Sequence, residues 1–343
     1  MSDDVIPRTM NSRATLARVA RDASVSMSTV SKVLNGRPGV SDETRVIVER
    51  LLESHEYNRR GGIHPHGALI EVVFEFFDSV WSLEIIRGVE RVAKENGLSV
   101  VLTESGNRHS LAKEWIDGIM QRRPVGVILV FSDLSPEHKR QLRTRNIPFV
   151  IVDPAGDPAP DVPSIGSANW AGGVLATRHL IQLGHKRIAM ITGPDDLMCS
   201  QARVSGFRSA LTAAGLPVYD DLILTGAFQR EDGVARGREL LTMIDRPTAI
   251  FAGNDVQALG LYEAARELGL SIPDDLSVVG YDDVQLAAWV GPPLTTVRQP
   301  LIEMAEAATR LVLRLRSEEV VDNLRIDLAT SLVVRGSTAA PSA

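Results

Sequence analysis

The sequence predicts two kinds of structure in one chain: a small all-α headpiece of the helix-turn-helix type, and an α/β core of two doubly wound parallel-sheet subdomains. In the first sixty residues, three short segments carry apolar residues at helical spacing. From Leu69 onward, very apolar runs alternate with amphipathic helices, which is typical of βα units. The same rhythm restarts near residue 187, so we expect two sheets.

Composition and charge limit the classes of protein that need to be considered. The chain has 343 residues, 44% of them hydrophobic, which is enough for a large core and for two or three domains. No apolar run approaches the ~20 residues needed to cross a bilayer, and MSDDVIPRTMNSR has no signal-peptide core. We therefore expect a cytoplasmic protein with no membrane partner. The single cysteine, Cys199, has no neighbours at metal-ligand spacing, so we expect no disulfide, no metal site and no cofactor.

Charge is unevenly distributed along the chain. Residues 1–60 carry ten Lys and Arg against eight Asp and Glu, a balance of +2, which leaves −8 for residues 61–343. An acidic surface repels phosphate. Any nucleic-acid binding should therefore be confined to the N-terminal segment.

Residues 14–58 are expected to form three short helices. In the first, LARVARDA at 16–23, apolar residues recur at i, i+3, i+4 and i+7. Ser26 suits the N-cap of a second helix at about 27–34, because its hydroxyl can accept from free backbone N–H groups of the next turn. Ser41 suits the N-cap of a third helix, whose first turn is acidic. Helix, short turn, helix is the arrangement that lays a second helix in the DNA major groove.

The outward face of the second helix has residue types that suit DNA. Hydroxyls and early backbone N–H groups suit phosphates, whereas Lys32 and the side chains at 27 and 28 can reach base edges. A three-helix protein-contact module is the alternative, because helix-turn-helix patterns are easily matched by chance. The outward residues are Met27, Ser28, Ser31 and Lys32.

The stretch TLARVARDASVSMSTVSKVLNGRPGVSDETRVIVERLLESHEYN resembles the DNA-binding headpiece of the lac repressor (LacI/GalR) family. The resemblance implies that Met27, Ser28 and Lys32 face the bases. Lys32 stands where the family usually has Arg and lacks its bidentate fork, which affects guanine readout. The resemblance assigns phosphate contacts to Thr15, Leu16, Thr29, Ser31, Asn35, Ser41 and Thr44.

Residues 59–68 are expected to form a hinge or linker. In the family a short helix follows the headpiece and wedges a Leu into the minor groove. Here the ten residues from Asn58 to Gly67 include three glycines and a proline, which oppose a helix, and no Leu is available as a wedge. Arg59 and Arg60 can enter the minor groove or neutralise phosphates; a solvated flexible linker is the alternative.

The core strands are predicted from runs too apolar for a sheet with one solvated face, so helices should cover both faces. A final helix near 301–316 and the strands of IDLATSLVVRGS complete the chain. The expected strands are LIEVVF (69–74), LSVVLTE (98–104), VGVILVF (125–131), PFVIVD (148–153), RIAMITG (187–193), LILTGAF (222–228), TAIFAGN (248–254) and LSVVGYDD (276–283).

The predicted organisation follows from these elements. It consists of a disordered tail at 1–13, a helix-turn-helix domain at 14–58, a linker at 59–68 and a core at 69–343 that binds an effector and dimerises. The first core subdomain is expected at about 69–183 and 300–324, and the second at about 184–297 and 325–343.

Two such subdomains place a ligand cleft at the carboxyl ends of their strands. Carboxylates, amides, one Arg and aromatic rings are what a sugar requires, because they pair its hydroxyls in two directions and cover its C–H faces. Taken singly, Arg203 could be a surface charge and Trp170 simple packing. The residues expected to bind an effector are Asp78, Trp81, Trp170, Arg203, Phe228, Asn254, Asp282 and Gln299, with Phe76 and Asn169 beside them.

The core also resembles the lac repressor family and, more distantly, periplasmic sugar-binding proteins. The segments that carry this are HLIQLGHKRIAMITGP, ARVSGF, AIFAGNDVQALG, IPDDLSVVGYDD and PPLTTVRQP. The resemblance implies effector contacts at Arg203, Asn254 and Asp282. Where the lac repressor has an acidic residue before the GG-containing helix, this chain has Asn169-Trp170, so we expect an effector other than galactose, such as a pentose or a plant-derived oligosaccharide.

The function predicted from these features is a sugar-responsive repressor of a carbohydrate-use operon, released from a palindromic operator by a small sugar or oligosaccharide. A single headpiece reads too few base pairs for genomic specificity, so a homodimer is expected. The alternative is a cytoplasmic sugar-binding or enzymatic α/β protein whose N-terminal helices contact another protein. The chain has no G-x-G-x-x-G after its first strand and no G-x-x-x-x-G-K-[ST], G-x-S-x-G or H-E-x-x-H motif, so we expect no enzyme.

Overall fold

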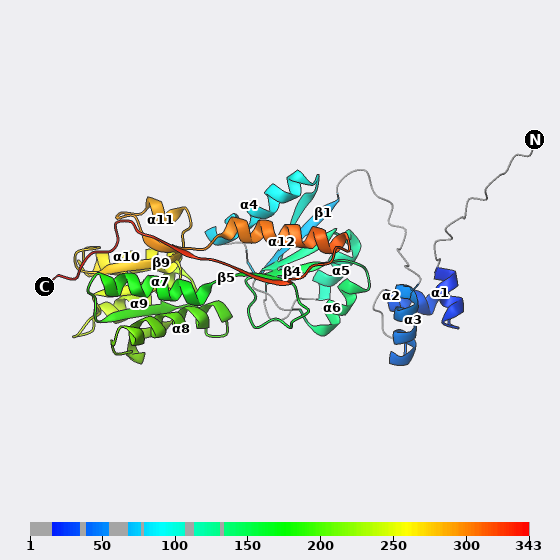
Figure 1. The fold of residues 1–343 in the computed structure, drawn as a ribbon, viewed down its shortest axis with the longest axis horizontal. Coiled ribbons are helices and arrows are strands. Elements are labelled where there is room, and N and C mark those ends of the chain that lie inside the picture. Colours follow the sequence, from blue (N-terminus) through cyan, green and yellow to red (C-terminus); the bar gives the residue numbers. More distant parts are fainter. Residues whose placement is uncertain are drawn as a thin grey trace, which may run out of the picture. The chain divides into compact units, whose positions relative to one another are not determined.

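A computed structural model describes residues 16–34, 39–54, 68–76, 79–106, 113–130 and 134–342. The predicted tail at 1–13 and the predicted linker up to residue 67 lie outside these ranges. By its internal contacts the chain divides into two compact units. One holds the N-terminal helices together with residues 136–147, and the other holds the α/β core (Figure 1).

The N-terminal helices are α1 (Leu16–Asp22), α2 (Met27–Leu34) and α3 (Asp42–Ser54). Both predicted caps are confirmed, because the Ser26 and Ser41 hydroxyls accept from the backbone N–H groups of Thr29 and Thr44 at 3.1 and 3.3 Å. The helices enclose a small apolar core. Its buried members are Val19, Ala20, Val30, Val33, Leu34, Val48 and Leu52.

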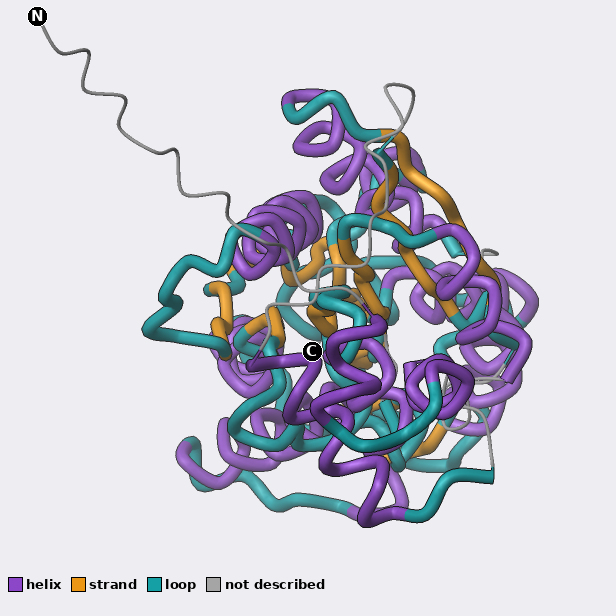
Figure 2. Tube along the Cα trace, turned by 90° about the vertical axis from the view of Figure 1, so that its right-hand side faces the viewer, coloured by secondary structure: helices purple, strands orange, loops and turns teal. Residues whose placement is uncertain are grey.

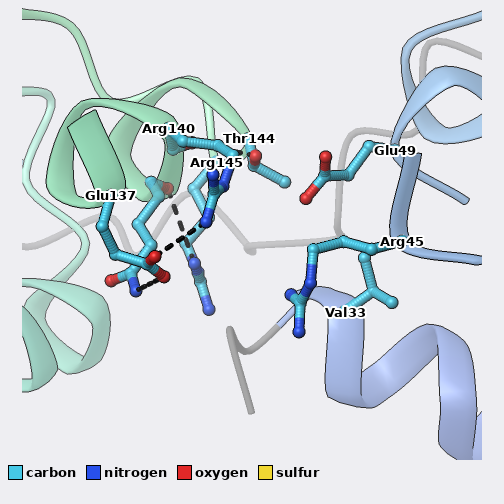
Figure 3. A pocket seen from close by; sticks show the side chains of 8 residues that line it. Val33, Arg45, Glu49, Glu137, Arg140, Thr144 and Arg145 are labelled. Carbon is cyan, nitrogen blue, oxygen red and sulfur yellow. Dashed lines mark hydrogen bonds and ion pairs between the residues drawn. The ribbon is translucent and has the colours of Figure 1, made fainter. Parts of the chain in front are cut away.

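Helix α6 (Pro136–Arg143) belongs to the same unit and is stabilised by its own charges. Arg140 Nη2 lies 2.8 Å from Glu137 Oε2, and Gln141 Nε2 donates to Glu137 Oε1 at 3.0 Å (Figure 3). The hydrogen bond from Gln141 and the charge of Arg140 hold the pKa of Glu137 below its usual range, although burial opposes them. Exposed i, i+3 pairs of this kind contribute little to stability, about 0.2–0.5 kcal/mol.

The first core sheet has the strand order β11-β5-β4-β3-β1-β2, and every neighbouring pair is parallel. The strands lie among helices in the side view of Figure 2. Helices α4 (Val80–Glu95), α5 (Lys113–Arg122) and α12 (Leu301–Arg316) accompany this sheet. Its strands are β1 (Leu69–Phe74), β2 (Ser99–Glu104), β3 (Gly126–Val130), β4 (Phe149–Val152), β5 (Ser164–Ser167) and β11 (Arg325–Leu328).

The second core sheet has the order β12-β10-β9-β8-β6-β7. It departs from the all-parallel prediction in one place, because β12 runs antiparallel to β10. Its strands are β6 (Ile188–Thr192), β7 (Ile223–Thr225), β8 (Ala249–Ala252), β9 (Ser277–Asp282), β10 (Thr295–Arg298) and β12 (Ser331–Val333). Its helices are α7 (Asn169–Gln182), α8 (Met198–Ala213), α9 (Arg230–Leu241), α10 (Asp255–Glu267) and α11 (Leu286–Trp289), with a short 3₁₀ turn at Asp220–Leu222.

The prediction that both faces of every strand are covered is wrong for β2. This strand lies at the edge of the first sheet, and Leu102 is 42% exposed. None of its residues is fully buried, although its apolar sequence resembles that of a central strand.

The chain passes between the two halves of the core three times. The passages are β5 to α7, β10 to α12 and β11 to β12. Helix α7 packs against α8 and the second sheet, so the first passage falls at residues 167–169, earlier than the expected 183. Strand β11 pairs with β5 in the first sheet, so the last passage comes after Leu328, later than the expected 324.

Helices α7 and α8 approach so closely that each requires a glycine at the contact. A Cβ atom on Gly173 would lie 2.4 Å from the Arg203 carbonyl oxygen, and one on Gly206 would lie 2.2 Å from the Trp170 carbonyl oxygen. Neither backbone oxygen can move without displacing its helix. The Gly172-Gly173 pair noted in the sequence is therefore a packing requirement.

The C-terminal segment lies across the amino-terminal ends of the strands of the second sheet. In Figure 1 it is the last part of the chain that runs back from α12 and ends at C. The Ser337 hydroxyl donates to the Val278 carbonyl at 2.6 Å and accepts from the Thr295 N–H at 2.8 Å. Buried His185 contacts the Thr248 hydroxyl through Nδ1 at 2.8 Å and the Ala339 carbonyl through Nε2 at 2.9 Å. Since a carbonyl can only accept, Nε2 carries a proton.

Among the described residues, no helix has both the length and the apolar character needed to cross a bilayer.

We predict that Gly206→Ala destabilises the protein by about 1–3 kcal/mol, because the added methyl group overlaps a helix backbone. Gly156→Ala is the matched control, since its Cβ would meet no atom within 4 Å. Thermal unfolding of both variants measures the difference. Equal Tm values would show that the α7 and α8 contact is looser than described.

We also predict that the contribution of His185 to the free energy of unfolding falls as the pH drops below 6.5. Burial lowers the pKa of His185 from its ordinary value of 6.5, although the hydrogen bond to Ala339 partly opposes this. Above pH 6.5 the ring is neutral in both states and its contribution is complete. Below pH 6.5 the unfolded chain binds a proton that the folded state resists, so the free energy of unfolding decreases. The difference in Tm between wild type and His185→Gln should shrink as the pH is lowered from 7.5 to 5; a difference that does not change with pH would exclude His185 as a pH-dependent contributor.

Candidate functional site

Three charged side chains meet at the carboxyl ends of the core strands. Asp153 follows β4 of the first half, Asp282 ends β9 of the second, and Arg203 projects from α8. They are 2%, 5% and 3% exposed. Charged groups are rarely buried unless they are paired or have a ligand to meet.

Arg203 is held by uncharged groups. Its Nε donates to Asn169 Oδ1 at 2.9 Å, and its Nη1 donates to the Gly253 carbonyl at 2.7 Å. Its guanidinium carbon lies 3.7 Å from the centroid of the Tyr281 ring and 5.5 Å from that of Phe228. Within the described residues, no carboxylate lies within ion-pair distance of this guanidinium.

Asp282 is tied to the first half of the core through an amide. Gln299 Nε2 donates to Asp282 Oδ1 at 2.6 Å, and the Ser167 hydroxyl donates to Gln299 Oε1 at 2.8 Å. Asp282 has a φ of 110° and Asp283 a φ of 59°, so the chain turns sharply where β9 ends. Backbone strain of about 1–3 kcal/mol per residue is typical of sites whose geometry is fixed by surrounding contacts.

The buried carboxyls titrate near neutral pH. Burial raises the pKa of Asp282 to about 7 and that of Asp153 to about 6, while Arg203 opposes both shifts. A carboxyl in this range can accept a hydrogen bond when ionised and donate one when protonated. This dual capacity suits a ligand hydroxyl, which can also do both.

Several buried polar atoms around Arg203 lack a hydrogen-bond partner among the described residues. They are Asp153 Oδ2, the Ser200 hydroxyl and the Tyr281 hydroxyl. Buried polar atoms are almost always satisfied in folded proteins. Three open ones around a single guanidinium indicate a site for a polar ligand.

Two further residues from the sequence prediction shape this site. The Asn254 side chain caps α10 by accepting from the Gln257 N–H at 2.8 Å, and its amide donates to the Phe228 carbonyl at 3.0 Å. Phe228 has a φ of 64°, and its ring packs against Gly193, whose Cβ would lie 2.1 Å from it. Asn254 therefore fixes the loop that carries the Phe228 ring towards Arg203.

The other predicted residues have different positions. Trp81 is buried in the apolar core of the first half with Ile85 and Leu301, and Trp170 is 50% exposed. Phe76 is 49% exposed, and Asp78 lies outside the described residues.

The sequence prediction did not single out Asp153, Ser167, Ser200 or Tyr281. Asp153 was detectable, because it ends the run PFVIVD at the carboxyl end of a predicted strand. Tyr281 lies inside an apolar strand and gave no comparable signal. Neither did Ser167 or Ser200, whose roles depend on contacts with residues far away in the sequence.

The predicted recognition helix has the expected outward face. Met27 is 56% exposed, Ser28 and Lys32 are exposed, and Thr29 and Ser31 are half-buried. Leu16 packs partly against the headpiece core, and the exposed Ser41 hydroxyl donates to that of Thr44 at 2.7 Å at the start of α3. Thr15 and Asn35 lie outside the described residues.

Across the described residues, no group of three or more His, Cys, Asp or Glu is arranged to hold a metal ion.

Comparison with known proteins matches both parts of the chain. Residues 15–60 match the family of bacterial regulatory proteins called the lacI family, and residues 177–338 match a periplasmic binding protein-like domain. The ribose operon repressor of Escherichia coli K12 is 35% identical over 333 residues, covering 94% of this chain and 99% of that protein.

Two solved structures extend the likeness to three dimensions. The transcriptional regulator CelR in complex with cellobiose has a TM-score of 0.71 and 32% identity, covering 95% of this chain and all of that chain. The lac repressor dimer bound to operator and an anti-inducer has a TM-score of 0.70 and 28% identity, covering 95% and 99%. This chain therefore belongs to the lacI family of bacterial regulatory proteins and is a regulator of transcription, not an enzyme.

Proposed function

We propose that this protein is a cytoplasmic repressor that binds a palindromic operator as a homodimer and is released from it by a small sugar. The observation that carries the sugar assignment is the buried cluster of Asp153, Arg203 and Asp282 with its open hydrogen-bonding atoms. The relatives support a sugar as the effector, since one is a repressor of a ribose operon and another was solved with cellobiose.

The chemistry of the cluster favours a ligand rich in hydroxyl groups. Such a group donates to a carboxylate and accepts from a guanidinium, so one ring with adjacent hydroxyls can meet Asp153, Arg203 and Asp282 together. The rings of Phe228 and Tyr281 add apolar surface next to Arg203. A pentose or a small oligosaccharide is the proposed effector class.

DNA reading is assigned to the headpiece, proposed to span residues 14–58. Met27, Ser28 and Lys32 would face the bases, as their exposure on α2 permits. Residues 59–68 are proposed as the linker to a core at 69–343. The phosphate contacts are proposed for Thr15, Leu16, Thr29, Ser31, Asn35, Ser41 and Thr44.

Switching requires that the effector bind two arrangements of the core unequally. The Ser167, Gln299 and Asp282 chain of hydrogen bonds joins the two halves. A sugar that meets both Asp153 and Asp282 would contact both halves, on either side of this link. The effector would in this way favour one arrangement of the halves, and the linker would transmit the change to DNA.

The test begins with a panel of ribose, arabinose, xylose, glucose, galactose and cellobiose. A sugar that binds only the folded state raises Tm by an amount set by its concentration relative to Kd. We predict that Asp282→Ala leaves operator affinity within a few fold of wild type but removes the response to that sugar. Charge-assisted hydrogen bonds to a hydroxyl contribute roughly 1.5–3 kcal/mol.

Operator affinity is measured on the palindrome recovered by selection from random duplex DNA, without and with sugar at saturating concentration. Asp221→Ala, an exposed carboxylate of the same half, is the control and should respond normally. An Asp282→Ala protein that responds like wild type would remove Asp282 from the effector site.

We predict that Lys32→Ala weakens binding to this palindrome by roughly 1–3 kcal/mol and relaxes preference at one base position. Arg50→Ala, which removes an exposed cation from α3, is the matched control and should keep base preference. Fluorescence titrations against point-mutated palindromes give both quantities. If affinity and preference survive in Lys32→Ala, helix α2 is not the reader.

A further inference from the structure

Asn169 is the first residue of α7 and lies between two charged groups of opposite sign. Its Oδ1 accepts from Arg203 Nε at 2.9 Å. Its Nδ2 donates to the Ser167 carbonyl at 3.2 Å and lies at the limit of hydrogen-bond distance, 3.5 Å, from Asp153 Oδ1. The amide is 8% exposed, so water cannot replace it freely.

An uncharged amide can face a cation and an anion at once, through two different atoms. Its carbonyl oxygen accepts from the guanidinium, and its NH₂ group donates to the carboxylate. Each charge therefore gains a partner without neutralising the other. This explains why Arg203 has no ion pair with a described carboxylate, although Asp153 lies on the other side of the Asn169 amide.

Because Asn169 keeps Arg203 and Asp153 apart, each of them retains atoms that can still form hydrogen bonds. Arg203 uses Nε and Nη1, and none of its remaining donors has a partner among the described residues. Asp153 Oδ2 is buried and also lacks one. If the two groups paired directly, in the bidentate geometry that Arg and carboxylates favour, these same atoms would be consumed.

We propose that Asn169 is a positioning residue that keeps Arg203 and Asp153 apart, so that the hydroxyl groups of the effector, rather than the two side chains themselves, complete the hydrogen bonds of the site. The proposal rests on the proposed sugar-binding function. It assigns to Asn169 no contact with the sugar. The amide acts through the two charged groups that it holds.

The decisive variant is Asn169→Asp, which has nearly the same shape and an adverse charge at neutral pH. An ionised carboxylate at this position pairs with Arg203 and repels Asp153. We expect the affinity for the responding sugar to fall by about tenfold or more at pH 8, the loss typical of one charge-assisted hydrogen bond. Operator affinity without sugar should stay within a few fold of wild type.

The pH profile separates positioning from general support. A protonated carboxyl accepts through one oxygen and donates through the other, as the amide does. The affinity of Asn169→Asp relative to wild type should therefore recover as the pH is lowered from 8 to 5. The comparison is made at each pH, because Asp153 and Asp282 titrate in this range in both proteins.

Gln182→Glu is the matched control, since it makes the same chemical change at an exposed position of the same helix. It should bind sugar like wild type at every pH. If Asn169→Asp does not fold, Asn169→Ala replaces it and should lose sugar affinity by a similar factor without recovery at low pH.

Isothermal titration with the responding sugar gives the affinities. Retention of sugar affinity within about twofold in Asn169→Asp, or a loss that is the same at every pH, would overturn the proposal while leaving the proposed function intact. If no sugar of the panel binds the wild-type protein, the proposed function itself fails, and the role of Asn169 fails with it.

Discussion

The arrangement of the core depends on one buried guanidinium. Moving Arg203 out of water has a large cost in free energy, which its neighbours offset with two uncharged oxygen atoms and two aromatic rings. Each neighbour comes from a different element: Asn169 from the start of α7, Gly253 from the end of β8, Tyr281 from β9 and Phe228 from a loop. Holding one side chain therefore constrains the mutual positions of all four.

The close packing of α7 on α8 belongs to the same constraint. Gly173 lies against the backbone of Arg203, and Gly172 lies against the Tyr281 hydroxyl, where a Cβ would approach to 2.2 Å. Larger side chains at either position would push α7 away from the second half and carry Asn169 with it. The two glycines thus determine how far the Asn169 amide, at the start of α7, lies from Arg203 on α8.

Much of the fold could be predicted from the sequence, because period and composition are local properties. Helix α12 was expected at 301–316 and is found there, and β1 matches its predicted range of 69–74. The pairing of β11 with β5 and the exposed edge at β2 were missed, since strand order depends on contacts between distant residues. In the site, Arg203, Asp282 and Gln299 were expected as a group, and the structure brings them close to one another. Asp153 was overlooked although its place at the end of a predicted strand pointed to it. Tyr281 was missed because what distinguishes it is a buried hydroxyl without a hydrogen-bond partner, which no local pattern encodes.

The three passages between the halves of the core are bonded to one another. The Ala168 N–H donates to the Leu328 carbonyl at 2.8 Å, the Thr330 hydroxyl donates to the Ala168 carbonyl at 3.4 Å, and Ser167 donates to Gln299. Three adjacent tethers resist sliding and separation, which leaves rotation about an axis through them as the easiest relative motion of the halves. The charged cluster is close to this axis. Leu69, the first residue of β1, lies at the amino-terminal end of its strand, which is the end away from the axis. Displacement in a rotation grows with distance from the axis, so the core acts as a lever in which a shift too small to break the cluster becomes a larger movement at Leu69.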